Sequence, residues 1–558
     1  MAYIRSKTLF FTTSPRTPLK MLPELKILSD FQNQKWNMES QIRFMEELAK
    51  HDEFCGVGSI NDKAFSARDR INRAPKSLGF VDLSPVILIT KVGINFIEAT
   101  NKEEVLLRQL LKFQLPSPYH KETEGFKGIF NVKPYLEIFR LIDSLEYLSF
   151  DELMIFGMQL THYNRFNEIV TKIKDFRAQK TQTKLRYKDF KNEILHLEIS
   201  KIYQLEIASG MIKTRETKEI SKEKFITTKA SNLRDYTDAA FRYLRATSMV
   251  EISQSNYSIS IAQDKKAEVK FFLKTISKKP NFIKDEAKYK AYLFNENKPK
   301  LYYDDKERLL KRLTEIPQFT KEISNSSIKE LKEILTTAIN SRKEQALKRQ
   351  IESLKTYKDY DNVMEMFKDI QQNRLYDAPL ILEWNVWRTL TMLNGGEIKA
   401  NLKFDDNGIP MSNASGNMPD IACDYGEFGV IVEVTMQSGH RQYEMESESV
   451  SRHLAHFKKS INKEAYCFFI APKINESCIA HFYALHKINI QYYGGKSVII
   501  PLELNVLIDM LEKSYKIRKL TPKEMREIFL YSEQQAQIST DEKQWYDSVK
   551  NKILNGTF

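Results

Sequence analysis

The spacing of hydrophobic residues changes along the chain, and each change predicts a different kind of element. Residues 100 to 220 look mainly helical, with one helix ending at Pro116. From residue 304 to 374, leucine and isoleucine recur every three or four positions, with charges of both signs between them. This spacing lines apolar side chains along one face of a helix, so we expect a helical connector in this stretch.

Two stretches in the first 300 residues combine a helix with short strands. Residues 64–99 read as a basic helix broken near Pro75, then a short strand, a turn at Gly93 and another helix. Residues 227–261 read as a helix whose pattern changes to a strand-like alternation near Val250, as in a β-hairpin. This order of elements is typical of winged-helix domains, so we predict two winged-helix-like modules.

Strands alternate with helices from about residue 375 onward. We expect an apolar helix at 376–393, a loop at 403–417, a pair of strands, another helix, and apolar strands at 465–472 and 496–504. This alternation predicts an α/β domain in the C-terminal part of the sequence.

The length of the chain predicts more than one domain. Single hydrophobic cores stop growing at roughly 250–300 residues, whereas this sequence has 558 residues, 42% of them hydrophobic. We therefore expect a multidomain α/β protein with a mostly helical N-terminal region. The predicted parts are two winged-helix-like subdomains at 1–115 and 116–300, a helical linker at 301–374 and the α/β domain at 375–558.

The charge balance is basic. Lysine and arginine outnumber aspartate and glutamate by 86 to 73, which gives a formal net charge of +13. Such a balance favours a polyanionic partner, but an ordinary basic soluble protein would have it too. Charge alone leaves these two interpretations open.

Cysteine spacing and hydropathy indicate the cellular compartment in which the protein is expected. The four cysteines are scattered and have neither the spacing of zinc ligands nor that of a disulfide framework. No stretch has the roughly 18 apolar residues of a membrane helix, and the first residues lack the apolar segment of a signal peptide. We therefore expect a reduced, soluble, cytoplasmic protein without structural zinc.

The strongest candidate chemistry lies in the segment NMPDIACDYGEFGVIVEVT, residues 417–435. Asp420 follows a proline, which breaks any helix and places the acid at the edge of a strand. Glu433 lies within a β-branched apolar run, where a carboxylate must be paired, protonated or bound to a metal. Two strands joined through CDYGEFG would bring both acids to one end of a sheet, which suits a hard cation such as Mg²⁺.

Two further acids and a histidine extend this pair. In the helix predicted at 440–461, Glu446 and His453 fall on a stripe that should be apolar, so we expect both to face the same site. Glu383 lies on the aromatic-rich face of the helix upstream. It is either salt-bridged to Arg388 or directed at the same cluster.

Each of these residues also has an interpretation without catalysis. Asp420 could belong to a turn, Glu446 could be a solvated helix residue, and His453 could be a buried imidazole with satisfied hydrogen bonds. Glu383 could be half of a surface ion pair. Their joint occurrence within 71 residues favours a functional site.

Such a cluster suits the hydrolysis of a phosphodiester, in which a metal polarises the phosphoryl group and acidifies water. Three of the acids would be ligands of Mg²⁺, namely Asp420, Glu433 and Glu446. Glu383 would complete the metal shell or a second site, and His453 would hydrogen-bond phosphate or water. In the usual PD-(D/E)xK nuclease motif a lysine follows the second acid by two residues, whereas here Thr435 stands at that position.

Six runs spread over nearly the whole chain carry a resemblance to a known family. Four lie in the C-terminal part, namely LEWNVWR, ASGNMPDI, VIVEVTMQSGHRQYEMESESVSRH and CFFIAPKIN, and two near the start, namely SPRTPLKMLPELKIL and AFSARDR. Together they resemble the AlwI/BstNBI group of type IIS restriction and nicking endonucleases. Because the runs are long and ordered, they are far more specific than the spacing of two acids.

The resemblance implies a DNA-reading N-terminal region of two subdomains, a helical linker and a C-terminal nuclease domain with the PD-(D/E)xK restriction-endonuclease-like fold. In that family the second acid is followed by Val-Thr, so Thr435 is the family state. The family's acids and histidine fall on the same five residues that the strand and helix patterns select: Glu383, Asp420, Glu433, Glu446 and His453.

The same resemblance makes basic residues of the N-terminal region candidates for DNA contacts. They are Arg68, Arg70, Arg73 and Lys76 in the first module, and Arg234, Arg242 and Arg245 in the second. Such residues would contact phosphates or guanine edges. A solvated basic face would look the same in the sequence.

These expectations describe a Mg²⁺-dependent type IIS restriction endonuclease that binds a short asymmetric site in double-stranded DNA and cuts a few bases outside it. The alternatives are a strand-specific nicking endonuclease of the same family, an inactive sequence-specific DNA-binding protein, and a nuclease of RNA or of DNA repair. The expected functional partner is a cognate DNA methyltransferase. Double-strand cleavage would require a transient homodimer or a second catalytic subunit.

Overall fold

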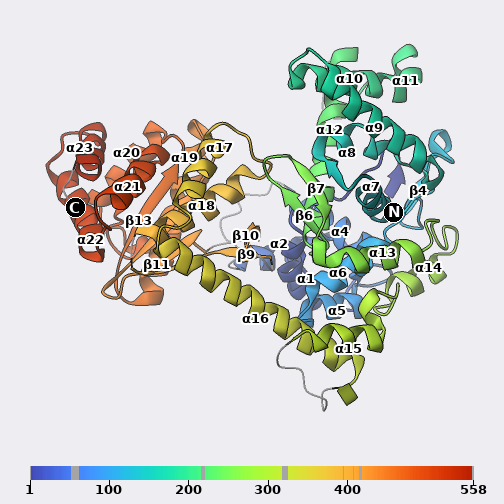
Figure 1. The fold of residues 1–558 in the computed structure, drawn as a ribbon, viewed down its shortest axis with the longest axis horizontal. Helices are drawn as coiled ribbons and strands as arrows, with labels where there is room; N and C mark the ends of the chain where they lie inside the picture. Colours follow the sequence, from blue (N-terminus) through green and yellow to red (C-terminus); the bar gives the residue numbers. More distant parts are fainter. Residues whose placement is uncertain are drawn as a thin grey trace. The chain divides into compact units, whose positions relative to one another are not determined.

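The computed structural model describes residues 2–51, 54, 62–214, 220–316, 324–393, 395–405, 408–413 and 418–555. It divides into two compact units (Figure 1). The N-terminal unit comprises residues 1–48 and 59–338, and the C-terminal unit is formed mainly by residues 339–558. The division falls inside a helix of the predicted linker, Ile328–Lys355. The division into four parts stays a prediction.

The N-terminal unit is mostly helical. Its helices are α1 (Met21–Ser29), α2 (Met38–Lys50), α3 (Lys63–Ile71), α4 (Ala74–Ser77), α5 (Lys91–Glu98), α6 (Lys102–Lys112), α7 (Pro134–Leu145), α8 (Phe150–Ile155), α9 (Phe166–Gln182), α10 (Tyr187–Ile202), α11 (Gln204–Ala208), α12 (Lys222–Arg245), α13 (Lys266–Thr275), α14 (Glu286–Leu293) and α15 (Lys306–Thr314). Its strands are β1 (Ala2–Ile4), β2 (Val81–Asp82), β3 (Leu88–Ile89), β4 (His120–Glu122), β5 (Tyr147–Ser149), β6 (Val250–Ser253) and β7 (Ser258–Ile261). β5, β7 and β6 form an antiparallel sheet in that order, while β1 pairs with β4 and β2 with β3.

The order of helices and strands predicted for this unit is found, with one exception described below. The basic helix breaks as expected, since α3 ends at Ile71 and Pro75 lies in the first turn of α4. α12 leads into the antiparallel hairpin β6–β7, which begins at Val250 as the change of pattern predicts. Local periodicity was sufficient for both because each element is amphipathic.

The turn predicted at Gly93 is wrong, because this residue lies in the first turn of α5. Thr90 caps the helix, and its hydroxyl oxygen accepts a hydrogen bond from the Gly93 N–H at 3.0 Å. A Cβ atom at Gly93 would lie 2.1 Å from the carbonyl oxygen of Phe80. The glycine permits a close backbone contact, which the local sequence cannot distinguish from a turn.

The C-terminal unit alternates helices and strands. Its helices are α16 (Ile328–Lys355), which crosses the division, α17 (Tyr360–Gln371), α18 (Ala378–Leu393), α19 (His440–Ile461), α20 (Glu476–Lys487), α21 (Leu504–Lys516), α22 (Pro522–Ile538) and α23 (Glu542–Asn555). Its strands are β8 (Glu397–Ala400), β9 (Leu402–Phe404), β10 (Pro410–Asn413), β11 (Ile421–Asp424), β12 (Phe428–Val434), β13 (Glu464–Ala471) and β14 (Ile499–Glu503). The helices and strands expected in this region are therefore confirmed.

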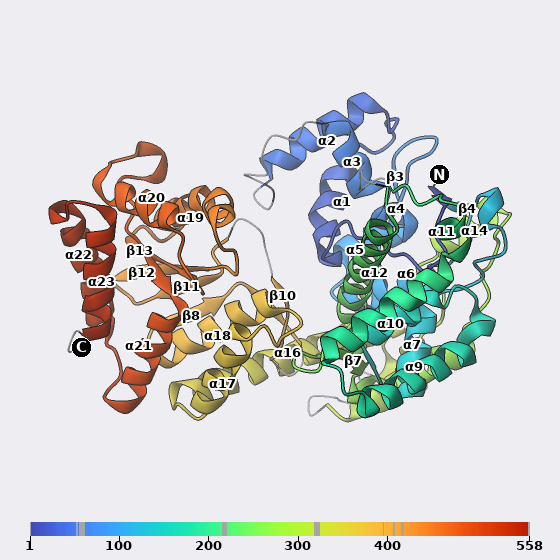
Figure 2. The same ribbon diagram turned by 90° about the horizontal axis from the view of Figure 1, so that it is seen from above.

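The predicted α/β domain is built on a mixed five-stranded sheet with the order β14-β13-β12-β11-β8. β12, β13 and β14 run parallel, whereas β11 is antiparallel to both of its neighbours. Figure 2 shows α19 and α20 on one face of this sheet and α18 and α21 on the other. Helices on both faces explain why the central strands β12 and β13 are buried at nearly every position.

The loop predicted at 403–417 is wrong in part. β9 and β10 pair as antiparallel strands within this stretch, with Phe404 opposite Pro410. Gly408, with a positive φ of 78°, lies in the connection, where glycine allows the chain to reverse. Residues 406, 407 and 414–417 lie outside the described residues.

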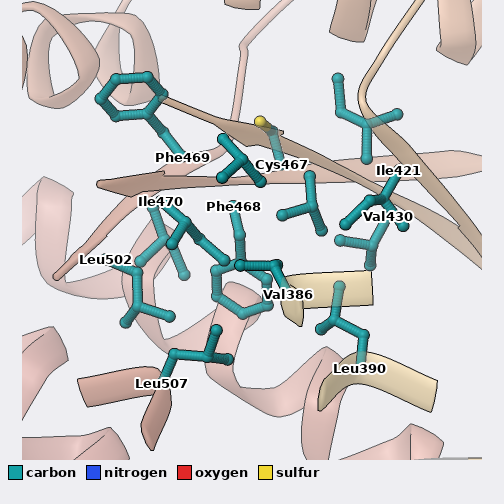
Figure 3. Packing of buried hydrophobic residues seen from close by; sticks show 14 of the residues in the cluster. Val386, Leu390, Ile421, Val430, Cys467, Phe468, Phe469, Ile470, Leu502 and Leu507 are labelled. Carbon is teal, nitrogen blue, oxygen red and sulfur yellow. The ribbon is translucent and has the colours of Figure 1, made fainter. Parts of the chain in front are cut away.

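The core of the C-terminal unit lies between the sheet and its helices (Figure 3). Successive residues of β13 point to opposite faces: Phe468 lies toward Val386 of α18, while the Phe469 ring is 5.4 Å from Phe482 of α20. Every position of β12 is buried. The acid that β12 carries, Glu433, therefore has no solvent-facing side of the strand to occupy.

The remaining sequence features concern cysteines and membrane spans. Cys423, Cys467 and Cys478 are buried free thiols, and Cys55 lies outside the described residues. In the part of the chain that the structure describes, every helix is too short or too polar to cross a bilayer.

Candidate active site

Two of the predicted acids meet at one end of the hairpin formed by β11 and β12. Ile421 of β11 pairs with Val432 of β12, so Asp420 and Glu433 continue this register at the same edge. The Oδ2 atom of Asp420 accepts a hydrogen bond from the backbone N–H of Val434 at 2.7 Å. This contact fixes the Asp420 side chain beside the strand that carries Glu433.

α19 places two more predicted residues against the end of β12. Glu446 Oε1 accepts a hydrogen bond from the hydroxyl of Thr435 at 2.8 Å, one residue beyond the strand. His453 Nδ1 lies 2.8 Å from Glu433 Oε1. The side chains of Glu433 and His453 are only 9% and 12% exposed, so water competes little for this hydrogen bond.

Glu383 on α18 is oriented by a residue that the sequence did not suggest. The Nδ2 atom of Asn413, at the end of β10, lies 2.8 and 2.6 Å from its two carboxylate oxygens. Arg388, the partner in the alternative interpretation, donates instead to asparagine side chains on α17 and α18. Glu383 thus belongs to the acidic cluster, and Asp420 is near enough to affect its charge.

The four carboxyl groups share a buried environment of one charge sign. Burial is the main cause that raises the pKa of each above its ordinary value. Their mutual proximity adds to this: Asp420 raises the pKa of Glu383, and Glu433 raises that of Asp420. Glu446 acts on Glu433 in the same way. Such a concentration of shifted groups is typical of functional sites.

The imidazole of the cluster is shifted in the opposite direction. Burial lowers the pKa of His453 to about 4, and the neighbouring Arg452 contributes to the same shift. The ring is therefore neutral at neutral pH, and the hydrogen bond with Glu433 occupies Nδ1. Nε2 is then the ring nitrogen left for another partner.

The donor set fits a hard divalent cation. As the side chains stand, no three His, Cys, Asp or Glu residues of the described ranges converge to hold a metal by themselves. Mg²⁺ usually takes only one or two carboxylates, with water and phosphate oxygens filling the other positions. A divalent charge would also offset the repulsion that raises the pKa values of Asp420 and Glu433.

Arg68 and Arg70 lie two residues apart on α3, but in different environments. Arg68 is exposed, and its guanidinium donates to Gln41 at 2.9 Å. Arg70 forms an ion pair at 2.7 Å with Glu24, whose side chain is fully buried. Arg68 is thus accessible to a ligand, whereas Arg70 is bound within the protein.

The next two candidates flank and enter α4. Arg73 is exposed and forms an ion pair with Asp69 one turn earlier. Lys76 is half-buried, with its Nζ 5.2 Å from the centre of the Tyr119 ring. Burial lowers the pKa of Lys76, although the nearby Asp82 partly opposes this.

The three candidates on α12 become progressively more buried toward the end of the helix. Arg234 is exposed. Arg242 is half-buried and donates to Asp238 at 3.0 Å. Arg245 is only 7% exposed. Arg234 is therefore the most accessible of the three.

Sequence reasoning missed Asn413 and the part played by Thr435. Asn413 lies in a stretch predicted to be a loop, and nothing in the local pattern indicates that it contacts Glu383. The sequence shows Thr435 as a departure from the lysine motif that agrees with the resembled family, but it gives the side chain no partner. Side chains alternate along a strand, so a residue two positions after Glu433 lies on the same face and next to the site. This spacing was the available signal for the role of Thr435.

Among the solved structures that are similar to the chain are three endonuclease structures. The small subunit R.BspD6I2 of the heterodimeric restriction endonuclease R.BspD6I shares 23% identity, covering 34% of this chain and 98% of its own, with a TM-score of 0.30. The BpuJ1 endonuclease binding domain, in complex with pyrene- and phenanthrene-modified DNA, shares 14% identity, covering 52% and 96%, with a TM-score of 0.35. The restriction endonuclease FokI shares 12% identity, covering 94% and 99%, with a TM-score of 0.26.

Comparison with protein families gives the assignment. No curated protein matches the sequence. The family model for the AlwI restriction endonuclease matches residues 76–510, which is well over half of the chain. The chain therefore belongs to the AlwI restriction endonuclease family and is a type II site-specific deoxyribonuclease.

Proposed function

We propose that this restriction endonuclease is a Mg²⁺-dependent type IIS enzyme that binds a short asymmetric duplex site and cuts a few bases outside it. The observation that carries the proposal is the buried acidic cluster at the end of the β11–β12 hairpin. It brings together Glu383, Asp420, Glu433 and Glu446, with His453 hydrogen-bonded to one of them. The family assignment supplies the substrate class, DNA.

The proposed metal ligands are the carboxylates of Asp420, Glu433 and Glu446. A bound Mg²⁺ supplies charge stabilisation for the phosphoryl group and makes water more acidic. The backbone N–H of Val434 holds Asp420 in place, and Nδ1 of His453 holds Glu433. These two contacts limit the orientations that the carboxylates of Asp420 and Glu433 can adopt.

The remaining proposed roles are contacts with phosphate or water, support of the acidic cluster, and acceptance of a proton. With Nδ1 bound to Glu433, the Nε2 atom of His453 is available to hydrogen-bond a phosphate oxygen or the attacking water. Glu383 completes the acidic shell and is held by Asn413. Burial raises the pKa of Glu446 and so makes it a better proton acceptor than an exposed carboxylate, and Glu446 is our first candidate for taking the proton from the attacking water.

The N-terminal unit is the proposed DNA-reading part. Among the seven basic candidates, the exposed ones are Arg68 and Arg73 in the first predicted module and Arg234 in the second. Arginine is the side chain best suited to bidentate contacts with guanine or phosphate. Cleavage outside the bound site requires a DNA-reading unit that is separate from the nuclease unit.

Plasmid cleavage tests the proposal. The parent protein should convert supercoiled plasmid to discrete products with Mg²⁺ and leave it intact with EDTA. Asp420→Ala and Glu433→Ala should reduce the rate by at least about a thousandfold, as expected when groups needed at the transition state are removed. Asp424→Asn is the matched control, because Asp424 is an exposed acid at the opposite end of β11.

Sequencing of the cleaved ends distinguishes the alternatives. Ends at a fixed offset on both strands indicate a type IIS enzyme, which acts on both strands through a transient homodimer or a second subunit. A fixed end on one strand indicates a nicking endonuclease. Plasmid that binds the protein but stays undigested indicates an inactive DNA-binding protein. A methyltransferase encoded nearby would be identified as the functional partner if methylation by it protects the plasmid from cleavage.

A further inference from the structure

Thr435 stands immediately after β12, where its position is fixed by the sheet. Its backbone N–H donates to the carbonyl oxygen of Ile470 at 3.0 Å, which extends the parallel ladder between β12 and β13 by one residue. The residue is only 8% exposed. Because β12 and β13 are central strands, the backbone of Thr435 cannot change its place without disrupting the ladder.

The hydroxyl group of Thr435 has a defined direction of donation. The backbone N–H of Gln437 donates to its Oγ1 at 3.1 Å, so one lone pair of the oxygen is occupied. A threonine hydroxyl has a single hydrogen to donate. The other close partner is Oε1 of Glu446 at 2.8 Å, which as a carboxylate oxygen accepts. The hydrogen of Thr435 is therefore directed at Glu446.

This hydrogen bond connects the end of the sheet to the helix that carries Glu446 and His453. Glu446 lies on α19, seven residues before His453, which contacts Glu433. Glutamate has three side-chain torsions, and a free one would sample several rotamers. Fixing Oε1 removes most of this freedom and leaves Oε2 as the oxygen for a further ligand.

A threonine and a lysine would have different effects at this position. A lysine would place a positive charge beside Glu446 and neutralise it as an ion pair. A hydroxyl donor orients the carboxylate and leaves its negative charge available to a cation. The position occupied by lysine in the usual motif can thus serve as a support for an additional acidic ligand.

We propose that Thr435 is a positioning residue that fixes Glu446 as a ligand of the divalent cation. This inference rests on the proposed function, since it concerns the same site. It predicts that loss of the hydroxyl weakens cation binding about 10- to 100-fold, the usual cost of removing a group that orients a metal ligand. DNA binding without the cation should not change.

The test compares Thr435→Val, which lacks the donor, with Thr435→Ser, which keeps it. Mg²⁺ is titrated against each full-length protein without DNA, and the rise of the Tm is followed. A second titration gives the Mg²⁺ concentration that half-saturates single-turnover cleavage. DNA affinity in EDTA and the Tm in EDTA control for folding. Asp420→Ala serves as the reference for a variant that lacks a proposed ligand.

The expected result is that Thr435→Val needs about 10- to 100-fold more Mg²⁺ in both titrations and that Thr435→Ser lies within a few-fold of the parent. One result would overturn the role of Thr435: Asp420→Ala needs more Mg²⁺ than the parent, whereas Thr435→Val is half-saturated at the same Mg²⁺ concentration as the parent. This holds even if Thr435→Val cleaves DNA more slowly. The role is also overturned if serine does not rescue. If the parent itself cleaves independently of Mg²⁺, the proposed function fails as well.

Discussion

His453 on α19 and Glu433 on β12 are joined by a hydrogen bond of 2.8 Å between Nδ1 and Oε1. Burial lowers the pKa of the imidazole to about 4 and raises that of the carboxyl group well above its ordinary value. The histidine is thus a neutral ring that orients an acid, and not a positive charge that neutralises it. Its Nδ1 is committed to Glu433, so one of its effects on the reaction passes through the geometry of that carboxylate, in addition to the proposed contact of Nε2 with phosphate or water.

Replacing His453 by alanine should slow cleavage about 10- to 100-fold, because Glu433 loses the group that orients it. His453→Asn should recover part of this loss, since an amide can donate to the same carboxylate oxygen. Single-turnover cleavage at saturating and limiting Mg²⁺ measures the effect. The matched control is His456→Ala, an exposed histidine on the same helix. Equal effects of the two alanine variants would contradict the role assigned to His453.

Asn413 and Glu383 give a second test of the cluster. Asn413→Ala removes the amide that lies 2.8 and 2.6 Å from the two oxygens of Glu383. Asn413→Asp has almost the same size but places a second carboxylate beside a buried one, where two like charges cannot both ionise. The aspartate variant should therefore lose more activity than the alanine variant and also lower the Tm. If Asn413→Ala lost more activity than Asn413→Asp, the Asn413 side chain would contribute its shape and not a hydrogen bond to Glu383.

The acidic pair could be predicted from the sequence because strand geometry determines it. Alternation along a strand and a short connection between Asp420 and Glu433 suffice to place both at one edge. The stripe on the following helix was predictable for the same reason, since Glu446 and His453 are two turns apart. These inferences needed only local periodicity.

The supporting residues could not be predicted, because they depend on contacts between distant segments. Asn413 reaches Glu383 across 30 residues of sequence. Gly93 looks like a turn residue until the carbonyl of Phe80 is placed against it. Arg70 has the same basic surroundings in the sequence as Arg68, and only the buried Glu24 distinguishes them. Tertiary packing decides these cases.

Arg70 and Arg68 should therefore respond differently to substitution. Arg70→Ala leaves the fully buried Glu24 without its ion-pair partner, which should destabilise the protein by up to about 3 kcal/mol. Arg68→Ala removes an exposed guanidinium and should leave the Tm nearly unchanged while weakening DNA binding. Thermal unfolding and fluorescence anisotropy with a duplex containing the cleaved site measure the two effects.

The double variant Glu24→Gln/Arg70→Met is the control for this comparison. It removes both charges together, so no buried carboxylate is left unpaired, and it should recover much of the stability lost in Arg70→Ala. For Arg68→Ala, the slope of log affinity against log salt should fall by about one if the contact is to a phosphate. A loss of Tm as large as that of Arg70→Ala would assign Arg68 a structural role instead.

His486 makes the C-terminal unit sensitive to acid. The residue is fully buried on α20, and its Nδ1 donates to the carbonyl oxygen of Phe482 at 2.8 Å. Trp545 donates to the hydroxyl oxygen of Ser532 at 3.2 Å, so the hydroxyl hydrogen is free to point at Nε2 of His486, 3.1 Å away. This network requires the neutral ring, and burial lowers the pKa of His486 from 6.5 to about 4.

The direction of the pH effect follows from these two values. Between about pH 6.5 and pH 4 the unfolded chain binds a proton that the folded chain does not, so acid favours unfolding. The stabilising contribution is complete above about pH 6.5 and is lost as the pH falls toward 4, by about 3 kcal/mol in total. Urea unfolding followed by tryptophan fluorescence is suitable, since Trp384, Trp387 and Trp545 lie in this unit.

Comparison with His486→Gln isolates this residue from the carboxyl groups that titrate in the same range. Glutamine offers an amide donor and an acceptor in place of the two ring nitrogens, and it does not titrate. The variant should be less stable than the parent at pH 7, because its amide fits the network less well. The difference should shrink as the pH falls from 6.5 to 4, since only the parent takes up the extra proton on unfolding. Parallel stability curves for the two proteins over this interval would show that His486 does not cause the acid sensitivity.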